Sequence, residues 1–406
     1  MKITYLLAAL APAAWAGPSI AAITLDGTRD AAYGPALAVQ TVQTGFGNAT
    51  NPSGLGGGGE LDAAYAVVEN GRLYIMLTGN IENNFNKLSL FIDSKPGGEN
   101  VLSASPQYDY EYLSQNFGGM TFDAGFAADY HLYARWGSLT GSIFTVDIVD
   151  RNGGGSATVK GNGGYANVGG GTGVQSGVVN PGDMGLGSTG VGEVRNLTPF
   201  LTQPLEFGFN NTNTAGVGGS SGAAANQAAA LAVTKGFEFS IALTDIGNPQ
   251  PGDAIKIHAA YGNGNNNYHS NQILGGLPVG TGNLGGNGAG GSIGDLSGIN
   301  FNNFAGDQFF TITVTGIDGD LDYDGFVGIN DLNIVLSEWN NNGPLNDPRA
   351  DPSGDGFVGI ADLAVILGNW NVGTPPAAIS IPEPAMFMCT IALGFGLLKR
   401  GNPYRT

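Results

Sequence analysis

Short apolar runs with alternating polar positions recur along the first three quarters of the chain. Branched and aromatic side chains dominate these runs, and clusters of Gly, Asn and Pro separate them. Alternation with a period of two is typical of half-buried strands, and many short strands between turn signals are typical of an antiparallel β-sandwich. The predicted strands are AAYAVVE (63–69), RLYIMLTGN (72–80), KLSLFID (87–93), YHLYARW (130–136), IFTVDIVD (143–150), FEFSIAL (237–243), AIKIHAAY (254–261) and QFFTITVT (308–315).

Two other kinds of segment interrupt this pattern. The alanine-rich stretch 223–233 is the helical candidate, and it directly precedes a late strand. The glycine tracts GNGGYANVGGGTG (161–173) and GNLGGNGAGG (282–291) lack the tandem nonapeptide of calcium-binding β-solenoids, so we expect both to be long loops. The body of the protein, residues 17–315, is therefore predicted to be mainly β, an antiparallel β-sandwich with long Gly-rich loops.

The pattern changes near the C-terminus, where one motif occurs twice. The copies are DYDGFVGINDLNIVLSEWN and SGDGFVGIADLAVILGNWN. A calcium loop takes oxygen ligands from positions 1, 3, 5, 7 and 12, uses the backbone carbonyl at position 7, and needs glycine at position 6 for its sharp turn. Both copies fit this pattern. The predicted ligands are Asp320, Asp322, Asp324, Phe326 and Asp331 in loop one, and Asp351, Ser353, Asp355, Phe357 and Asp362 in loop two.

An apolar stripe with helical spacing follows each loop, and we expect its side chains to form the core of a small two-helix domain. The stripe residues are Leu332, Val335, Leu336 and Trp339 in the first copy, and Leu363, Ile366, Leu367 and Trp370 in the second. Val327 and Val358, at position 8, are expected to pair the two loops as a short strand. The only cysteine is Cys389, so bound metal rather than a disulfide would stabilise so small a core.

The two predicted sites differ in charge. Loop one offers four carboxylates, whereas loop two has Ser353 at position 3 and Pro352 at position 2. Fewer anionic oxygens should weaken the second site.

The order of parts distinguishes this region from an EF-hand pair. A strand-like segment, TITVTGID, precedes the first loop, and helix breakers, NNNGPLNDPRA, precede the second. Two repeats of loop and helix, each loop closed by Asp, resemble a type I dockerin over residues 316–371. The resemblance implies two calcium ions, a cohesin-like protein partner and a partner-binding surface at loop positions 10 and 11. Those positions hold Ile329, Asn330, Ile360 and Ala361, and a purely intramolecular role is the alternative.

The two ends of the chain have the patterns of sorting signals. Residues 1–16 combine a lysine, an apolar run and a small-x-small triplet, which predicts a secretory signal cleaved after Ala16. Residues 382–406 follow a linker (372–381) and join Pro382, Glu383 and Pro384 to an apolar segment and a basic pair. This tail resembles the PEP-CTERM sorting signal, which implies recognition by an exosortase-type enzyme and transient membrane insertion. We expect an exported protein, at the cell surface or extracellular, with the tail either cleaved or kept as an anchor.

The body carries a second resemblance. Four stretches are similar to family-9 carbohydrate-binding modules and DOMON-like sandwiches. They are ITLDGTRDAAYG (23–34), ELDAAYAVVENGRLYIMLTGN (60–80), KLSLFID (87–93) and the late FEFSIALTDIG (237–247). The resemblance implies a β-sandwich that binds sugars or a structural cation. Sugar binding would need exposed aromatic rings, and ordinary strand packing is the alternative for the same rings. The candidates are Tyr110, Tyr112, Tyr130, Tyr133 and Trp136.

Charge and motifs limit the function classes. A formal net charge of −18 opposes nucleic-acid and anionic-membrane partners. No H-E-x-x-H, G-x-S-x-G or phosphate-loop motif occurs, and His269 lies in a polar stretch where we expect it to be exposed. The leading hypothesis is a non-catalytic exported protein whose dockerin docks a carbohydrate-binding sandwich. The alternatives are a glycoside hydrolase and a structural surface-layer or matrix protein. Candidate hydrolase acids are Asp93, Asp109, Glu111, Asp123, Asp147 and Glu238.

Overall fold

The structure is a computed structural model, and it describes nine segments of the chain. These segments are residues 23–46, 59–108, 113–138, 142–153, 161–170, 173–183, 197–213, 215–288 and 294–376. The predicted signal cleavage at Ala16 and the sorting motif Pro382, Glu383 and Pro384 lie outside them. Within these segments, no helix is long and apolar enough to span a membrane.

The described chain is mainly β. Its strands are β1 (Ala38–Val39), β2 (Glu60–Glu69), β3 (Arg72–Asn80), β4 (Lys87–Asp93), β5 (Tyr130–Ser138), β6 (Ser142–Asp150), β7 (Asn162–Gly169), β8 (Val174–Val179), β9 (Leu205–Asn210), β10 (Gly236–Ala242), β11 (Ala254–Gly262), β12 (His269–Leu274) and β13 (Phe310–Thr313). Its α-helices are α1 (Gln227–Ala232), α2 (Ile329–Ser337) and α3 (Ile360–Gly368). Each predicted strand overlaps an observed one, and the helical candidate 223–233 contains α1.

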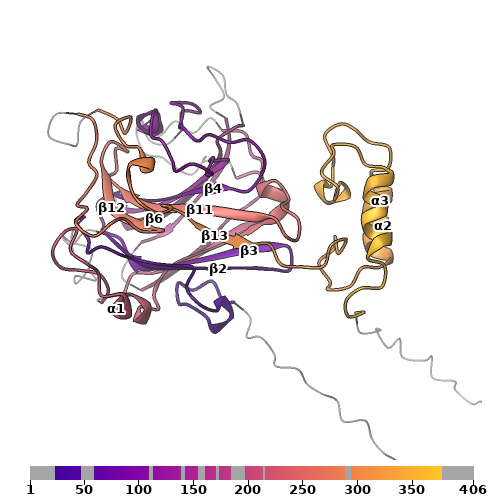
Figure 1. The fold of residues 1–406 in the computed structure, drawn as a ribbon, viewed down its shortest axis with the longest axis horizontal. Helices are drawn as coiled ribbons and strands as arrows, with labels where there is room; N and C mark the ends of the chain where they lie inside the picture. Colours follow the sequence, from indigo (N-terminus) through magenta and orange to yellow (C-terminus); the bar gives the residue numbers. More distant parts are fainter. Residues whose placement is uncertain are drawn as a thin grey trace, which may run out of the picture.

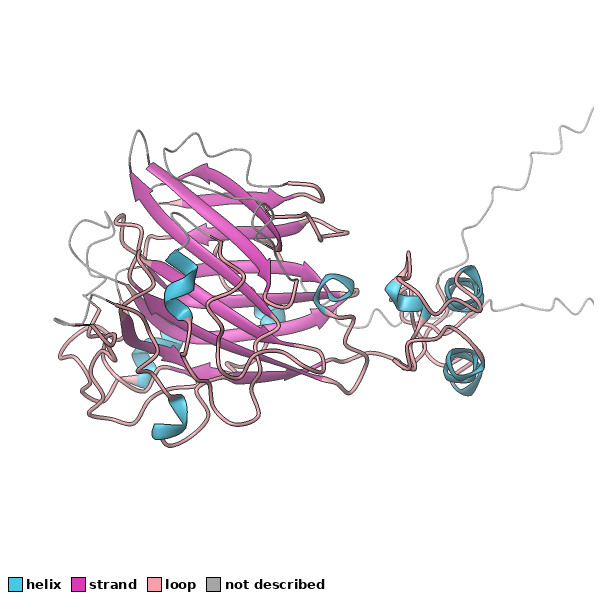
Figure 2. Cartoon of the chain, turned by 90° about the horizontal axis from the view of Figure 1, so that it is seen from above, coloured by secondary structure: helices cyan, strands magenta, loops and turns pink. Residues whose placement is uncertain are grey.

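Two antiparallel sheets form the body (Figures 1 and 2). Sheet one has the strand order β1-β2-β3-β10-β9-β8, and sheet two has the order β12-β11-β4-β5-β6-β7. The remaining strand, β13, pairs with the first half of β11, while β12 pairs with its second half. Strands far apart in the sequence are neighbours in both sheets, as β3 with β10 and β4 with β11 show, so the body closes only when distant segments meet.

Apolar side chains that alternate along the strands face each other between the two sheets. Sheet one contributes Ile75 and Phe237, sheet two contributes Leu90 and Phe144, and all four are buried in one large cluster. The alternation that predicted the strands is therefore the alternation between this core and the outer face of each sheet.

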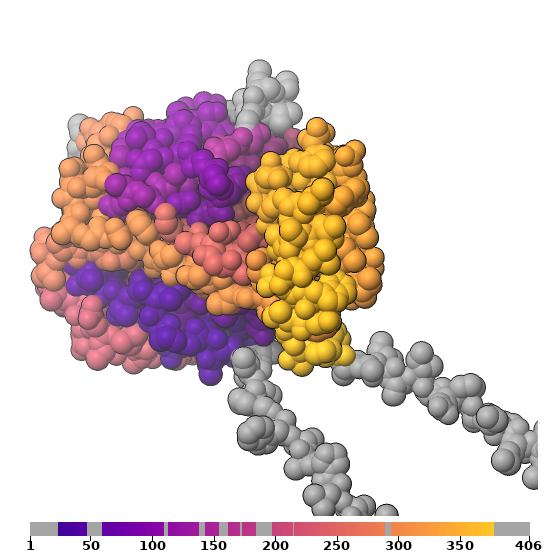
Figure 3. Space-filling model, turned by 45° about the vertical axis from the view of Figure 1, so that its right-hand side comes forward, coloured from indigo at the N-terminus to yellow at the C-terminus, as the bar shows by residue number. Residues whose placement is uncertain are grey.

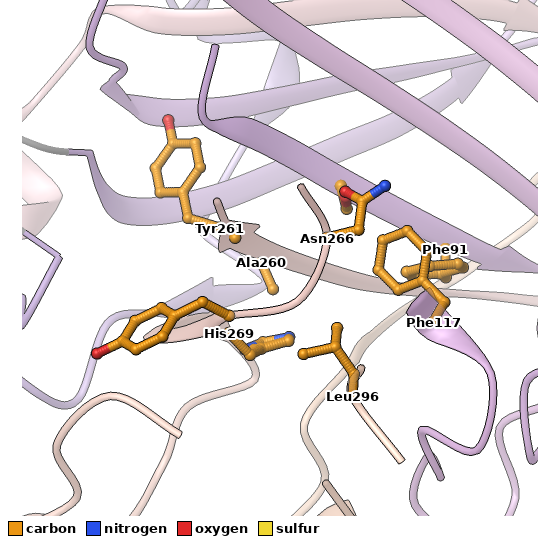
Figure 4. A pocket seen from close by; sticks show the side chains of 10 residues that line it. Phe91, Phe117, Ala260, Tyr261, Asn266, His269 and Leu296 are labelled. Atoms are coloured by element: carbon orange, nitrogen blue, oxygen red, sulfur yellow. The ribbon is translucent and has the colours of Figure 1, made fainter. Parts of the chain in front are cut away.

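The outer face of sheet two is also buried. Phe91 points away from the main core and packs with Phe117 and Phe122 from the connecting segments, and Phe122 in turn stacks on Phe301. Figure 4 shows the edge of this second cluster, where Phe91, Phe117 and His269 border a cavity of about 10 Å³. That volume holds about one water molecule, so this hollow is too small for a sugar.

The segment 23–34 and strand β10, which are about two hundred residues apart in the sequence, meet at sheet one. Glu238 of β10 is fully buried, and its carboxylate accepts hydrogen bonds from the backbone N–H of Asp26 (2.9 Å) and Gly27 (2.6 Å). The Tyr33 hydroxyl donates to the other oxygen at 3.1 Å. Gly27 has φ of +73° and lies directly against the backbone of β9, so this contact needs glycine. These contacts attach the first described segment to the sheet.

The prediction that residues 161–173 form a loop was wrong. Asn162–Gly169 is β7, which pairs with β6 along its whole length. Glycine suits this strand because a Cβ on Gly163 would overlap Leu197, and one on Gly164 would overlap Val179. The close approach of these neighbours, rather than turn formation, accounts for the glycines.

The C-terminal module, residues 317–374, contains α2 and α3 and lies beside one end of the body (Figures 1 and 3). It has a separate apolar cluster of its own that includes Leu321, Val335 and Ile366. The strand β13 leads directly into the module, so the module follows the two-sheet body without a long connection.

Candidate metal centre

Loop one gathers three carboxylates. Single oxygen atoms of Asp320, Asp322 and Asp324 all lie within 4.8 Å of one another. The loop is held in this shape by its own backbone, since the N–H of Asp324 donates to Asp320 at 3.1 Å and the N–H of Gly325 donates to Asp320 at 2.9 Å. Gly325, at position 6, has φ of +84°, a conformation that favours glycine.

The carboxylate at position 12 of loop one accepts backbone hydrogen bonds from both ends of the loop. Asp331 is fully buried, and its oxygens accept hydrogen bonds from the N–H groups of Leu321 (2.6 Å), Asp322 (3.1 Å) and Gly328 (2.7 Å). The first two donors belong to the start of the loop and the third precedes α2. Asp331 therefore ties the loop to the first turn of the helix, where a carboxylate also interacts favourably with the positive end of the helix dipole.

The charge at loop one favours a cation. Burial, together with the negative charges of Asp331, Asp322 and Asp324, raises the pKa of Asp320 to about 6, although a backbone hydrogen bond from Gly325 lowers it. A bound cation would remove this cost because it stabilises all the carboxylates in their charged form.

Loop two also gathers three carboxylates, but from positions 1, 5 and 12 rather than from positions 1, 3 and 5. Oxygens of Asp351, Asp355 and Asp362 lie within 4.8 Å of one another, and Gly356 has φ of +81°. The Ser353 hydroxyl donates to Asp351 at 3.2 Å, so position 3 faces the triad although it carries no charge.

Asp362 is buried like Asp331 but accepts fewer hydrogen bonds. Its donors are the N–H groups of Ser353 (3.1 Å) and Gly359 (2.7 Å). Loop one has a third donor at position 2, whereas Pro352 occupies that position in loop two and has no N–H. The proline thus explains the difference.

The two loops do not pair with each other, so the prediction of a strand between Val327 and Val358 was wrong. Val327 exchanges backbone hydrogen bonds with Asn371 (3.0 Å) and Val372 (2.9 Å), which follow α3. Val358 exchanges them with Asn340 (2.8 Å) and Asn341 (2.9 Å), which follow α2. Each loop is therefore closed by the segment that follows the other loop's helix, and the two repeats interlock.

The prediction of a fully buried apolar stripe was wrong in part. Val335 and Ile366 are buried at the centre of the module, and Leu332 packs against them. Leu336 is 49% exposed and Leu367 is 56% exposed. Helices of about two and a half turns bury one narrow face, so the position four residues along points outward. Trp339 and Trp370 lie beyond the helix ends and are also exposed.

The four predicted partner-binding residues are all exposed at the starts of the helices. Ile329 is 60% exposed and Ile360 is 79% exposed, and Asn330 and Ala361 follow them on the surface. Exposed isoleucines at equivalent positions of both repeats have no role in the module's own core.

The body offers less than the sequence suggested. Tyr130, Tyr133 and Trp136 are buried, so of the two readings of these rings the structure supports ordinary strand packing and not sugar stacking. His269 is buried rather than exposed, because it belongs to β12 and contacts Phe301 edge to face. Burial lowers the pKa of His269 to about 4. Tyr110 and Tyr112 lie outside the described residues.

The candidate hydrolase acids have separate partners. Asp93 pairs with Lys256 at 3.5 Å, Asp123 accepts from the N–H of Gln308 at 2.6 Å, and Glu238 binds the first described segment. Asp147 is buried on β6, and Asp109 and Glu111 lie outside the described residues.

The oxygen atoms that both loops offer as metal ligands suit a hard cation. Carboxylate oxygens form both triads and the Ser353 hydroxyl faces the second, and such oxygens are the ligands that Ca²⁺ prefers. Sequence reasoning found every acid of the triads but missed the interlocking of the repeats, for which the equivalent residues Asn340 and Asn371 were a signal. Both have positive φ, +65° and +63°, which Asn tolerates better than most residues. Comparisons with family models, with curated proteins and with solved structures found no match to this chain.

Proposed function

We propose that this chain is an exported protein whose C-terminal module binds two calcium ions and docks the two-sheet body to a cohesin-like partner protein. The observation that carries the proposal is a carboxylate triad in each of two interlocked loops, at positions 1, 3 and 5 of loop one and at positions 1, 5 and 12 of loop two. The predicted ligands are mainly carboxylate oxygens, and no histidine or cysteine occurs within 317–374. A hard cation is therefore favoured over a transition metal.

The exposed apolar residues support the docking role. Ile329 and Ile360 occupy equivalent positions of the two repeats, as do Leu336 and Leu367. Trp339 and Trp370 form a third such pair. Exposed large apolar side chains, tryptophan above all, are typical of the energetic centre of protein interfaces. A surface that is itself duplicated could engage one partner in two related orientations.

The two predicted sorting signals are the reason for proposing that the protein is exported. The signal cleaved after Ala16 exports the chain, and an exosortase-type enzyme processes the tail that contains Pro382, Glu383 and Pro384. Their support is the order of parts in the sequence, since these residues lie outside the described ranges. A non-catalytic role of the body agrees with the separate partners of Asp93, Asp123 and Glu238.

The test is calorimetric titration of Ca²⁺ into the full chain, with Mg²⁺ as the comparison ion. We expect two unequal Ca²⁺ sites, loss of the tighter one in Asp320→Ala and loss of the weaker one in Asp351→Ala. Asp93→Asn, which removes a carboxylate of the body, is the matched control and should keep both sites. The proposal fails if the wild-type chain takes up no Ca²⁺, or if Asp93→Asn removes a site.

A further inference from the structure

One side chain of loop one leaves the module and packs on the body. Tyr323 occupies position 4 of the loop, between the predicted ligands Asp322 and Asp324, and has φ of +59°. Its ring is partly buried against the main core of the two-sheet body. A residue of the candidate metal loop is therefore part of the contact between the module and the body.

The body is shaped to receive this ring. The ring lies against Gly71, in the turn between β2 and β3, and a Cβ added to Gly71 would overlap it. Asn248 lies beside the same turn, because Leu243 donates its N–H to the Gly71 carbonyl (2.9 Å) and accepts the N–H of Asn248 (2.8 Å). Glycine at the turn thus leaves room for the tyrosine.

Asn248 connects the body to both halves of the module. Its side-chain oxygen accepts the Tyr323 hydroxyl at 3.4 Å, and its side-chain N–H donates to the Pro348 carbonyl at 3.1 Å. Pro348 lies just before loop two. Asn248 also has a positive φ of +52°, which is set by the turn that follows Leu243–Ile246. One asparagine therefore holds the two repeats at the same point of the body.

Loop two makes no equivalent insertion. Its position 4 is Gly354, which is exposed and has no side chain to insert. Asp351 and Ser353 instead line a cleft of about 770 Å³ between the module and the body, opposite Lys95 and Phe200. This cleft separates loop two from the body. Of the two loops, loop one therefore supplies the side chain that packs on the body, while Pro348, before loop two, adds a backbone contact.

We propose that Tyr323 is a calcium-dependent latch that fixes the module on the body when loop one is loaded. This inference rests on the proposed calcium binding. The ring's direction follows from the backbone between Asp322 and Asp324, and the N–H of Asp324 is held by Asp320 (3.1 Å) and Asp322 (3.2 Å). A cation that draws these carboxylates together fixes that backbone. Without the cation their repulsion loosens it, and the ring leaves Gly71.

The experiment is hydrogen exchange of the full chain in Ca²⁺ and in chelator, read on the body's side of the contact. Segments 69–73 and 243–250 belong to the body, so their exchange reports docking and not folding of the module. We expect Ca²⁺ to slow their exchange about tenfold in the wild-type chain and in Tyr323→Phe, which keeps the ring. Tyr323→Ala should abolish this effect while α2 and α3 still gain protection from Ca²⁺.

Each other outcome is decisive. If Ca²⁺ protects α2 and α3 but leaves 69–73 and 243–250 unchanged in the wild-type chain, the latch is wrong and the calcium module stands. If Tyr323→Ala exchanges like the wild-type chain in Ca²⁺, the ring is not the latch. If calorimetry finds no Ca²⁺ uptake, the proposed function falls first, and the latch falls with it.

Discussion

Replacing the two buried position-12 aspartates tests how the loops hold their helices. Asp331 accepts three backbone N–H donors and Asp362 accepts two, because Pro352 has no N–H. A buried donor left without an acceptor costs about 1–3 kcal/mol. Asp331→Ala should therefore lower the free energy of opening of the module about 1–3 kcal/mol more than Asp362→Ala does. Chelator is present throughout, so that lost metal ligands do not contribute.

The assay is amide exchange of α2 and α3 in the full chain. A small module has a stability of only about 3–5 kcal/mol, so an alanine variant can open it completely. Asp331→Asn and Asp362→Asn, which each keep one acceptor oxygen, then provide the matched pair and should rank in the same order. Equal losses in both pairs, or a larger loss at Asp362, would refute the argument from hydrogen bonds.

Two further predictions concern the core and the body. Ile366→Ala should lower the module's stability by about 2–5 kcal/mol in denaturant unfolding, whereas Leu367→Ala, on the exposed side, should change it by less than about 1 kcal/mol; similar losses would contradict the burial difference. Burial raises the pKa of Glu238 from 4.5 to about 7, so the folded body binds this proton more tightly; the contribution of this group to stability is complete below pH 4.5 and falls by about 3 kcal/mol as the pH rises to about 7. Glu238→Gln should remove that part of the pH dependence from thermal unfolding curves, and an unchanged curve would contradict it.

The sequence predicted the strands whose side chains alternate, because that pattern records which face of a sheet is buried. It missed β1, β8 and β9, it failed at β7, where glycines are needed because neighbouring side chains lie close, and it failed at β12. Polar side chains of β12 are buried because they find distant partners: Gln272 accepts from the N–H of Leu61 at 3.1 Å, and Asn271 donates to the Gln43 carbonyl at 2.9 Å. Local sequence does not encode partners more than two hundred residues away, so this stretch resembled an exposed loop.

The candidate metal site was predicted better than the body because its ligands are local. Twelve consecutive residues contain all the acids of one triad, and the glycine at position 6 needs no distant partner. The direction of each apolar side chain depends instead on how the two helices cross. For that reason the sequence correctly predicted two helices with apolar residues, but half of the residues that it placed in the core are exposed.

The interlocking of the loops explains why the motif is written twice. Val327 is paired by residues that follow α3, and Val358 by residues that follow α2. A single copy would contain a loop and a helix but no strand partner for its own position 8, and it would leave the Val335 side of α2 uncovered by Ile366. Each copy thus completes the other's backbone and core. The repeats nevertheless diverge at position 4, tyrosine in one and glycine in the other, and the tyrosine is the residue that contacts the body. Duplication therefore accounts for the fold of the module, and the departures from it account for how the module is attached.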